Sequence, residues 1–146
     1  MNINEVAPCG IDCVNCELYR GNNNQELWEK IAGMRGTTPD KVVCSGCREQ
    51  GGCSFHPRCA TLECIREKGL DFCGDCDDFP CLNLLPAREH AERLPHNMKV
   101  FNLCTIKRDG VESFLSRAPE LRRRYFTGRM ILGAGPRLGD EDPYKD

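Results

Sequence analysis

The sequence has 146 residues, which allows one domain, or one small domain with an extension. Its net charge of −2 at pH 7 argues against a general nucleic-acid binder, because such proteins usually carry an excess of basic residues. No run approaches the about 18 apolar residues of a membrane span, and the N-terminus lacks the basic and apolar regions of a signal peptide. We therefore expect a cytoplasmic protein without a membrane segment.

Cysteine dominates the composition: the chain has 12, and all except Cys104 fall between Cys9 and Cys81. The first 80 residues are poor in other apolar side chains. Burial alone is therefore not expected to offset their conformational entropy, and metal–thiolate bonds would supply the missing free energy. Because the default compartment is reducing, persistent thiols are favoured over the alternative, a disulfide framework.

Residues 1–81 are predicted to alternate cysteine turns with short helices. Asn24 would begin one helix, and Gly33 and Gly36 are its natural stops. Its inner face would carry apolar residues at helical spacing: Leu27, Ile31 and Met34. A further helix is predicted over Cys59 to Lys68, with Gly69 at its C-terminal end.

Residues 80–118 are predicted to be purely helical. The apolar residues expected to face the core are Leu82, Leu85, Leu94, Met98, Phe101, Leu103, Ile106, Val111, Phe114 and Leu115. Cys104, which stands apart from the other cysteines, is expected to be a buried thiol that acts as a small hydrophobe. This segment would complete a cysteine-rich metal-binding domain that spans residues 1–118.

Residues 119–146 are predicted to form a C-terminal extension. The segment PELRRRYF would add one or two helical turns, and the glycine-rich stretch over residues 127–146 would be an extended tail, mobile or laid against a partner. The fold class that follows is small, α-rich and irregular. Short helices and zinc-knuckle turns would be organised by cysteine metal sites, and a helical C-terminal part and the tail would follow.

Three Cys-x2-Cys pairs are the strongest motif: Cys13/Cys16, Cys44/Cys47 and Cys73/Cys76. A gap of two residues lets one tight turn aim two thiolates at a single ion, and two such pairs about 15–30 residues apart are a recurrent zinc arrangement. A first cluster of ligands is therefore expected from Cys9, Cys13, Cys16, Cys44 and Cys47. The first two pairs alone would make a four-thiolate site.

A second cluster is expected around Cys73 and Cys76, and its candidate members are Cys53, His56, Cys59, Cys64, Cys73, Cys76 and Cys81. At least two partners must come from Cys59, Cys64 and Cys81, with Cys53 and His56 in reserve. Counting does not decide which four bind together, and the two clusters can interleave. Four thiolates around one zinc leave a net negative charge, and the nearby cations in the sequence are Arg48, Arg58, Arg66 and Lys68.

The segments CGIDCVNCELYRG, CSGCREQGG and CIREKGLDFCGDCDDFPCLNL resemble, in this order, a cysteine-rich bacterial and archaeal family called domain of unknown function 3795. The resemblance spans about residues 8–85, and NLCTIKRDGVESFL resembles the helical end of that family. It implies zinc binding without an assigned reaction. The implied ligands are Cys9, Cys13, Cys16, Cys44, Cys47, Cys59, Cys64, Cys73, Cys76 and Cys81. His56 stands where many relatives have another cysteine, which leaves open whether Cys53 and His56 bind metal.

The leading hypothesis is a small zinc-binding protein with about two structural zinc ions. Such a protein would act as an interaction module or accessory subunit, with another protein as its partner. Closed four-ligand sites leave no position for water, and the sequence holds no recognisable catalytic set, so an enzyme is not expected. The alternative is an electron-transfer or redox accessory subunit with 4Fe–4S clusters, because all-cysteine ligation suits iron as well. Neither a small-molecule substrate nor the oligomeric state follows from the sequence.

Two other interpretations are disfavoured. The spacing Cys9-x3-Cys13-x2-Cys16 is that of radical S-adenosylmethionine enzymes, but the chain is too short for their partial barrel. The run Arg122-Arg123-Arg124 before Tyr125 and Phe126 could contact nucleic acid. A run of three arginines is more often a solvated helix face, which is the interpretation we favour here.

Overall fold

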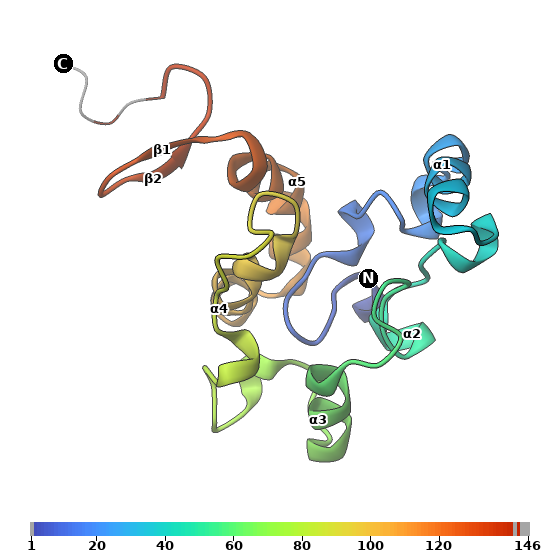
Figure 1. The fold of residues 1–146 in the computed structure, drawn as a ribbon. Helices are drawn as coiled ribbons and strands as arrows, with labels where there is room; N and C mark the ends of the chain where they lie inside the picture. Colours follow the sequence, from blue (N-terminus) through green and yellow to red (C-terminus); the bar gives the residue numbers. More distant parts are fainter. Residues whose placement is uncertain (1, 142, 144–146) are drawn as a thin grey trace.

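The computed structural model describes residues 2–141 and 143. This part of the chain is rich in helix and has one small antiparallel sheet (Figure 1). The helices are α1 (Gln25–Arg35), α2 (Cys47–Gln50), α3 (Ala60–Lys68), α4 (Lys99–Asp109) and α5 (Val111–Thr127), and the strands are β1 (Arg129–Ile131) and β2 (Gly135–Arg137). The segments between them contain single turns of 3-10 helix, several of which include or adjoin cysteines.

Helix α1 begins where the sequence predicts, passes through the first predicted stop, Gly33, and ends at the second. Asn24 precedes it, and Gly36 closes it with a φ of 61°, a left-handed conformation that glycine adopts without a steric penalty. The predicted inner face is wrong at Met34, which is 72% exposed, whereas Ile31 is partly buried against a core as expected. The helix instead buries Trp28 and Ala32, and the indole of Trp28 donates a hydrogen bond to the Glu17 carbonyl at 3.0 Å. The amphipathic stripe is therefore displaced by one residue.

Helix α3 also confirms its prediction, with Cys59 at its start and Gly69 at its end. The prediction that residues 80–118 are purely helical is wrong for residues 80–94. Only the single 3-10 turn Leu82–Leu84 forms there, and it buries Leu84 while leaving Leu82 86% exposed. Leu85 and Leu94 are exposed as well. Proline explains the interruption, because Pro80, Pro86 and Pro95 lack an N–H donor and disfavour helical backbone in the preceding residue.

Helices α4 and α5 form a hairpin around Gly110. Leu103, Ile106 and Phe114 are buried as predicted. Two residues of α4 contradict their predictions: Phe101 is exposed, and Cys104 is exposed rather than buried. The buried side of α4 is instead completed by Asn102, which lies one position further along the helix.

Helix α5 is longer than expected, since it continues through Pro119 to Thr127 and includes the whole segment PELRRRYF. The following stretch, predicted as an extended tail, forms the β1–β2 hairpin, in which Arg129 pairs with Arg137. This hairpin projects from the end of α5 (Figure 1). The prediction for residues 142 and 144–146 lies outside the described residues.

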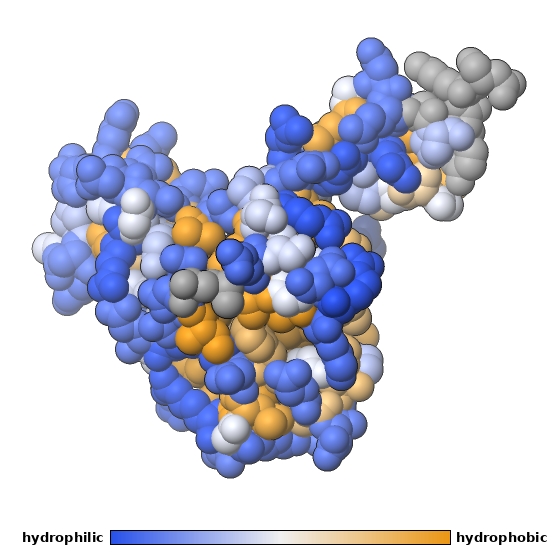
Figure 2. Space-filling view, turned by 180° about the vertical axis from the view of Figure 1, so that it is seen from behind, coloured by the Kyte–Doolittle hydropathy of each residue, from blue (hydrophilic) through white to orange (hydrophobic). Residues whose placement is uncertain are grey.

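The buried side chains form two cores. The first lies between α4, α5 and the N-terminal segment, and its members include Val6, Cys9, Cys13, Ile65, Phe72, Cys73, Leu84, Leu103 and Phe114. The second lies beneath α1 and consists of Leu18, Trp28, Ala32, Val42 and Cys44. The view from behind shows hydrophilic side chains over much of the surface, with apolar side chains gathered mainly in the body of the molecule (Figure 2). Every helix within the described residues is too short or too polar to cross a bilayer.

The N-terminal cysteine turn contacts α4 directly. Gly10 has a φ of 86°, and a β-carbon at this position would lie 2.9 Å from the Lys99 carbonyl oxygen. The buried amide of Asn102 donates a hydrogen bond to the Gly10 carbonyl at 2.7 Å. Glycine is therefore required here both by the backbone conformation and by the close approach of the helix.

Candidate metal centre

All 12 cysteines lie in the described part of the chain, and all are free thiols. Their burial differs. Cys9, Cys13, Cys44 and Cys73 are buried, Cys104 is exposed, and the others are partly buried. The buried cysteines belong to the two cores, where their sulfur atoms occupy positions that Val, Leu or Ile would fill in an ordinary small domain.

Four cysteines line a single cavity of about 180 Å³: Cys64, Cys73, Cys76 and Cys81. We call them the cavity thiols. Cys64 comes from α3, and Cys73 and Cys76 come from either end of a single 3-10 turn. Cys81 lies immediately before the 3-10 turn Leu82–Leu84. Three separate segments of the second predicted cluster thus present thiols to one space.

Lys68, in the last turn of α3, lies beside the cavity thiols. Its Nζ is 3.1 Å from the Sγ of Cys76 and 2.6 Å from a carboxylate oxygen of Asp78. Both contacts favour the charged ammonium, and the one with Asp78, the larger effect, does most to raise the pKa of Lys68. One of the cations expected to compensate a thiolate site is therefore in contact with a sulfur atom.

Burial is the main reason why the pKa of Cys73 is raised to about 12. The nearby thiols of Cys9, Cys81, Cys64 and Cys76 raise the pKa further, since like charges disfavour one another. The Cys73 thiol is therefore protonated at neutral pH unless a cation is present. A bound metal ion reverses this preference, because it requires the thiolate.

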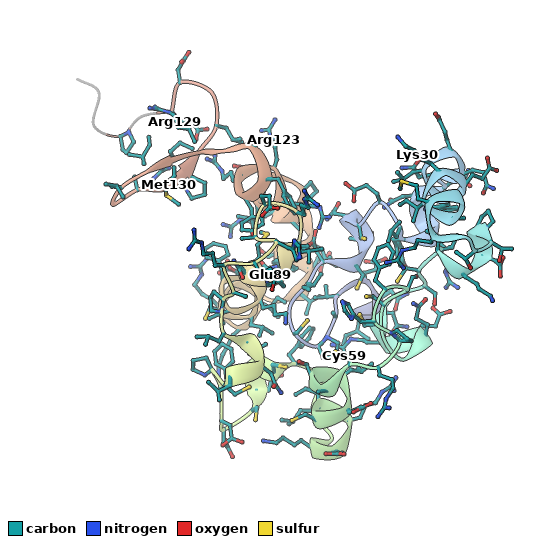
Figure 3. The ribbon with its side chains drawn as sticks, in the orientation of Figure 1. Lys30, Cys59, Glu89, Arg123, Arg129 and Met130 are labelled. Atoms are coloured by element: carbon teal, nitrogen blue, oxygen red, sulfur yellow. The ribbon has the colours of Figure 1, made fainter. Side chains whose placement is uncertain are left out.

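A second group, the inner thiols, consists of Cys9, Cys13 and Cys47. A hydrogen bond between the thiols of Cys13 and Cys47 lowers the pKa of Cys13 to about 7 and raises that of Cys47. Burial raises the pKa of Cys9, to which the nearby thiols of Cys59 and Cys13 also contribute. Figure 3 shows Cys59 just before α3. The structure thus places Cys59 near the inner thiols and leaves it outside the lining of the thiol cavity.

Arg48 holds the segments around the inner thiols together. Its guanidinium donates to the carbonyl of Val6 at 2.9 Å and to that of Asp71 at 2.6 Å. It also lies over the ring of Phe72, 4.8 Å from the centroid. Arg66, a second expected cation, donates to the Arg48 carbonyl and not to a sulfur atom.

Cys44 belongs to the second core, and Cys16 and Cys53 pack against it. Burial raises the pKa of Cys16, and Cys44 contributes to the shift. Within the first predicted cluster, Cys13 thus interacts with Cys47 and Cys16 with Cys44. His56 is exposed and forms a backbone bridge with Cys53.

The described thiols are not arranged around an ion as they stand. In residues 2–141 and at 143, no three His, Cys, Asp or Glu side chains form a group that could hold a metal ion. Zinc requires four sulfur atoms at about 2.3 Å from the metal. Closing the cavity thiols on an ion would therefore require them to move inward.

Sequence reasoning missed an ion pair that joins the first cysteine turn to α5. The side chain of Arg122 is only 14% exposed and lies 3.5 Å from buried Asp12 and 3.7 Å from Glu17. The favoured prediction of a solvated arginine face is therefore wrong for Arg122. Burial raises the pKa of the Asp12 carboxyl, and Asn15 and Arg122 partly offset this effect. No local signal identifies a partner 110 positions away.

The described chain is thus a helix-rich, cysteine-rich domain in which four cysteines contribute to the two cores. It belongs to the family described as protein of unknown function DUF3795, whose profile matches residues 5–86. This confirms the resemblance drawn from the cysteine segments. The matched region ends before α4, so NLCTIKRDGVESFL lies outside it. Searches of curated proteins and of solved structures found no match.

Proposed function

We propose that the cavity thiols bind zinc, and that the protein is a small cytoplasmic module whose metal is structural. The single observation that carries this proposal is the convergence of Cys64, Cys73, Cys76 and Cys81 on one cavity. All four belong to the family region. Four thiols from three segments are a donor set that fits zinc, which prefers tetrahedral sulfur ligation.

The residues around the cavity suit a charged metal–thiolate centre. Lys68 supplies an N–H donor to the Cys76 sulfur and a positive charge, as ligand sulfurs require from their surroundings. A zinc ion bound there would supply folding free energy by joining α3 to the 3-10 turns on either side of Asp78. With four protein ligands, such a site leaves no position for water, which favours a structural role over catalysis.

A second ion is assigned to the inner thiols, for a total of about two per chain. Cys9, Cys13 and Cys47 are its ligands in this proposal. The fourth is Cys59, which contributes to the raised pKa of Cys9, or Cys53, which contributes to the raised pKa of Cys47. Cys16 and Cys44 are left beside the second core. This assignment follows proximity in space, whereas sequence spacing groups Cys13 with Cys16.

Interaction with another protein is the function that we propose for the folded module. Its support is the exposure of Leu82 and Leu85, which follow the cavity ligand Cys81 directly. Exposed apolar side chains beside a rigid centre are a common feature of docking surfaces. Fixing Cys81 on a metal ion would also fix the turn that presents these leucines.

A second candidate, a 4Fe–4S centre, is favoured by one observation. A cavity of about 180 Å³ has more space than a single zinc ion needs within a closed tetrahedron of sulfur atoms. Hydrogen bonds to ligand sulfurs, such as the one from Lys68, also tune the reduction potentials of such clusters. In this case the module would serve as an electron-transfer or redox accessory subunit.

Elemental analysis of anaerobically purified protein distinguishes the two candidates. We expect about two zinc ions per chain and no acid-labile sulfide, and loss of about one ion in Cys73→Ser. Cys104→Ser is the matched control, because Cys104 is exposed on α4 and should leave the metal content unchanged. Iron with sulfide would select the second candidate. Protein without zinc or iron would refute both.

A further inference from the structure

A second cavity, of about 400 Å³, is lined by Arg35, Thr37, Lys41, Val42 and Ser54. It is formed where α1 ends and the 3-10 turn Pro39–Lys41 packs back against that helix. None of its lining residues is a cysteine, and none lines the thiol cavity. The cavity is a depression widely open to solvent, and its residues Arg35 and Lys41 are exposed.

The guanidinium of Arg35 is held in place by an aromatic ring. Its central carbon lies 3.9 Å from the centroid of Phe55. No acidic group among residues 2–141 and 143 pairs with Arg35, and its N–H groups donate no hydrogen bond within that part of the chain. A planar fork of donors is thus oriented by stacking and left available, which is the arrangement that recognises oxyanions.

Two further groups of the cavity can donate to an anion. The ammonium of Lys41 forms no ion pair within the described residues, and the Thr37 hydroxyl has no hydrogen-bond partner there. Ser54 is already committed, because its hydroxyl donates to the Val43 carbonyl at 3.0 Å. Buried Val42 adds an apolar surface. The cavity therefore combines two cations and a free hydroxyl with one apolar wall.

We propose that this cavity binds the phosphate group of a small phosphate monoester. A phosphate dianion matches two cations better than a single carboxylate does, and its three terminal oxygens can accept from the arginine fork, the ammonium and the hydroxyl. The cavity is larger than a phosphate ion needs, which leaves room for the attached organic group. The site is independent of the metal proposal, because none of its residues is a proposed metal ligand.

The test is a titration of the full chain, with its metal as purified, using inorganic phosphate and adenosine monophosphate as probes. We expect both probes to bind saturably. Binding is measured by calorimetry and, in NMR spectra, by the change in the side-chain N–H signal of Arg35. Arg35→Gln should weaken binding about tenfold or more, as loss of a charge-assisted contact requires. Arg35→Lys should be intermediate, since it retains the charge but loses the planar fork.

Lys30→Gln is the matched control, because it removes the same charge from the same helix outside the cavity. Lys30 is exposed on α1 (Figure 3), and its substitution should change affinity less than about twofold. Lys41→Gln and Thr37→Val provide independent tests if Arg35→Gln does not fold. The absence of saturable binding to either probe would overturn the proposal. The proposal would also be overturned if Lys30→Gln and Arg35→Gln lost the same affinity for the probes, or if the protein bound only an oligonucleotide.

Discussion

The cysteine-rich segment over residues 2–81 and the α4–α5 hairpin are held together in different ways. In the first, four buried cysteines share the core with larger apolar side chains such as Trp28, Ile65 and Phe72. In the second, Leu103, Ile106 and Phe114 pack by ordinary helix-to-helix burial. We propose that the first region depends on bound ions for its stability, whereas the second contributes apolar surface.

The two regions nevertheless share a core. Cys9, Cys13 and Cys73 belong to the same cluster of buried residues as Leu103 and Phe114. Lys107 of α4 also donates to the carbonyl of Gly74, next to a cavity thiol. The hairpin therefore covers the thiol-containing region, and loss of order on one side is expected to weaken the other.

Removal of metal should produce the largest effect. We expect a strong chelator to unfold the cysteine-rich segment, because its apolar burial is small, while α4 and α5 keep part of their helix content. Far-UV circular dichroism and amide hydrogen exchange on the same sample measure the two regions separately. Retention of native exchange protection in residues 5–86 after complete chelation would contradict the comparison.

Truncation within the hairpin should have the next largest effect. Phe114→Ala should lower the free energy of unfolding by about 3 to 5 kcal/mol, because it leaves a cavity in the shared core. Phe101→Ala is the matched control: Phe101 is 56% exposed, whereas Phe114 is 1% exposed. Denaturant unfolding of the metal-loaded protein gives both values. Equal losses would show that the first core is not centred on Phe114.

Breaking the ion pair between the two regions should lower the free energy of unfolding by about as much as Phe114→Ala, or slightly less. Arg122→Ala should lower the free energy of unfolding by about 3 kcal/mol, since it leaves the buried Asp12 carboxylate without a cation. Arg123→Ala, a change at the next position on an exposed side chain, should cost less than about 0.5 kcal/mol. Thermal or denaturant unfolding at about pH 7 measures the stability of both variants. Similar stabilities for the two variants would refute a role for the pair.

The smallest expected effect is the change in apparent zinc affinity per pH unit. Its sign follows from the protonation state of Cys73. With a pKa of about 12, this thiol is protonated in the metal-free protein across the physiological range. Zinc binding displaces that proton, so the apparent affinity should rise about tenfold per pH unit for each such proton. Competition with a chromophoric chelator at about pH 6.5, 7.0 and 7.5 measures how the apparent zinc affinity changes with pH. A flat profile would exclude Cys73 as a ligand.

Local signals in the sequence were sufficient for α1 and α3 of the cysteine-rich segment, whereas the short helix α2 was not predicted. Asn24, Gly36 and Gly69 mark helix ends through their own backbone preferences, so α1 and α3 begin and end as predicted. Prolines were harder to interpret. Pro119 allows α5 to continue, whereas Pro80 and Pro86 accompany irregular backbone, and tertiary packing decides between these outcomes.

Four of the predicted ligands share one space in the structure, but their grouping along the chain did not give it. Cys73 and Cys76 were expected to anchor a site with two of Cys59, Cys64 and Cys81, and the structure places Cys64 and Cys81 at the same cavity. Cys59 lies near Cys9 instead. Spacing along the chain identifies thiols that one turn can present, but contacts between distant turns depend on the fold. The same limit explains why the partner of Arg122 was not foreseen.

The hydrogen bond from Asn102 to the carbonyl of Gly10 has a consequence for how the family region is produced as a fragment. The family match ends at residue 86, whereas this bond and the close approach of Lys99 to Gly10 come from α4. A recombinant piece cut at residue 86 would expose the underside of its first turn to solvent. The shortest autonomous unit of this chain therefore extends at least through α4 and α5.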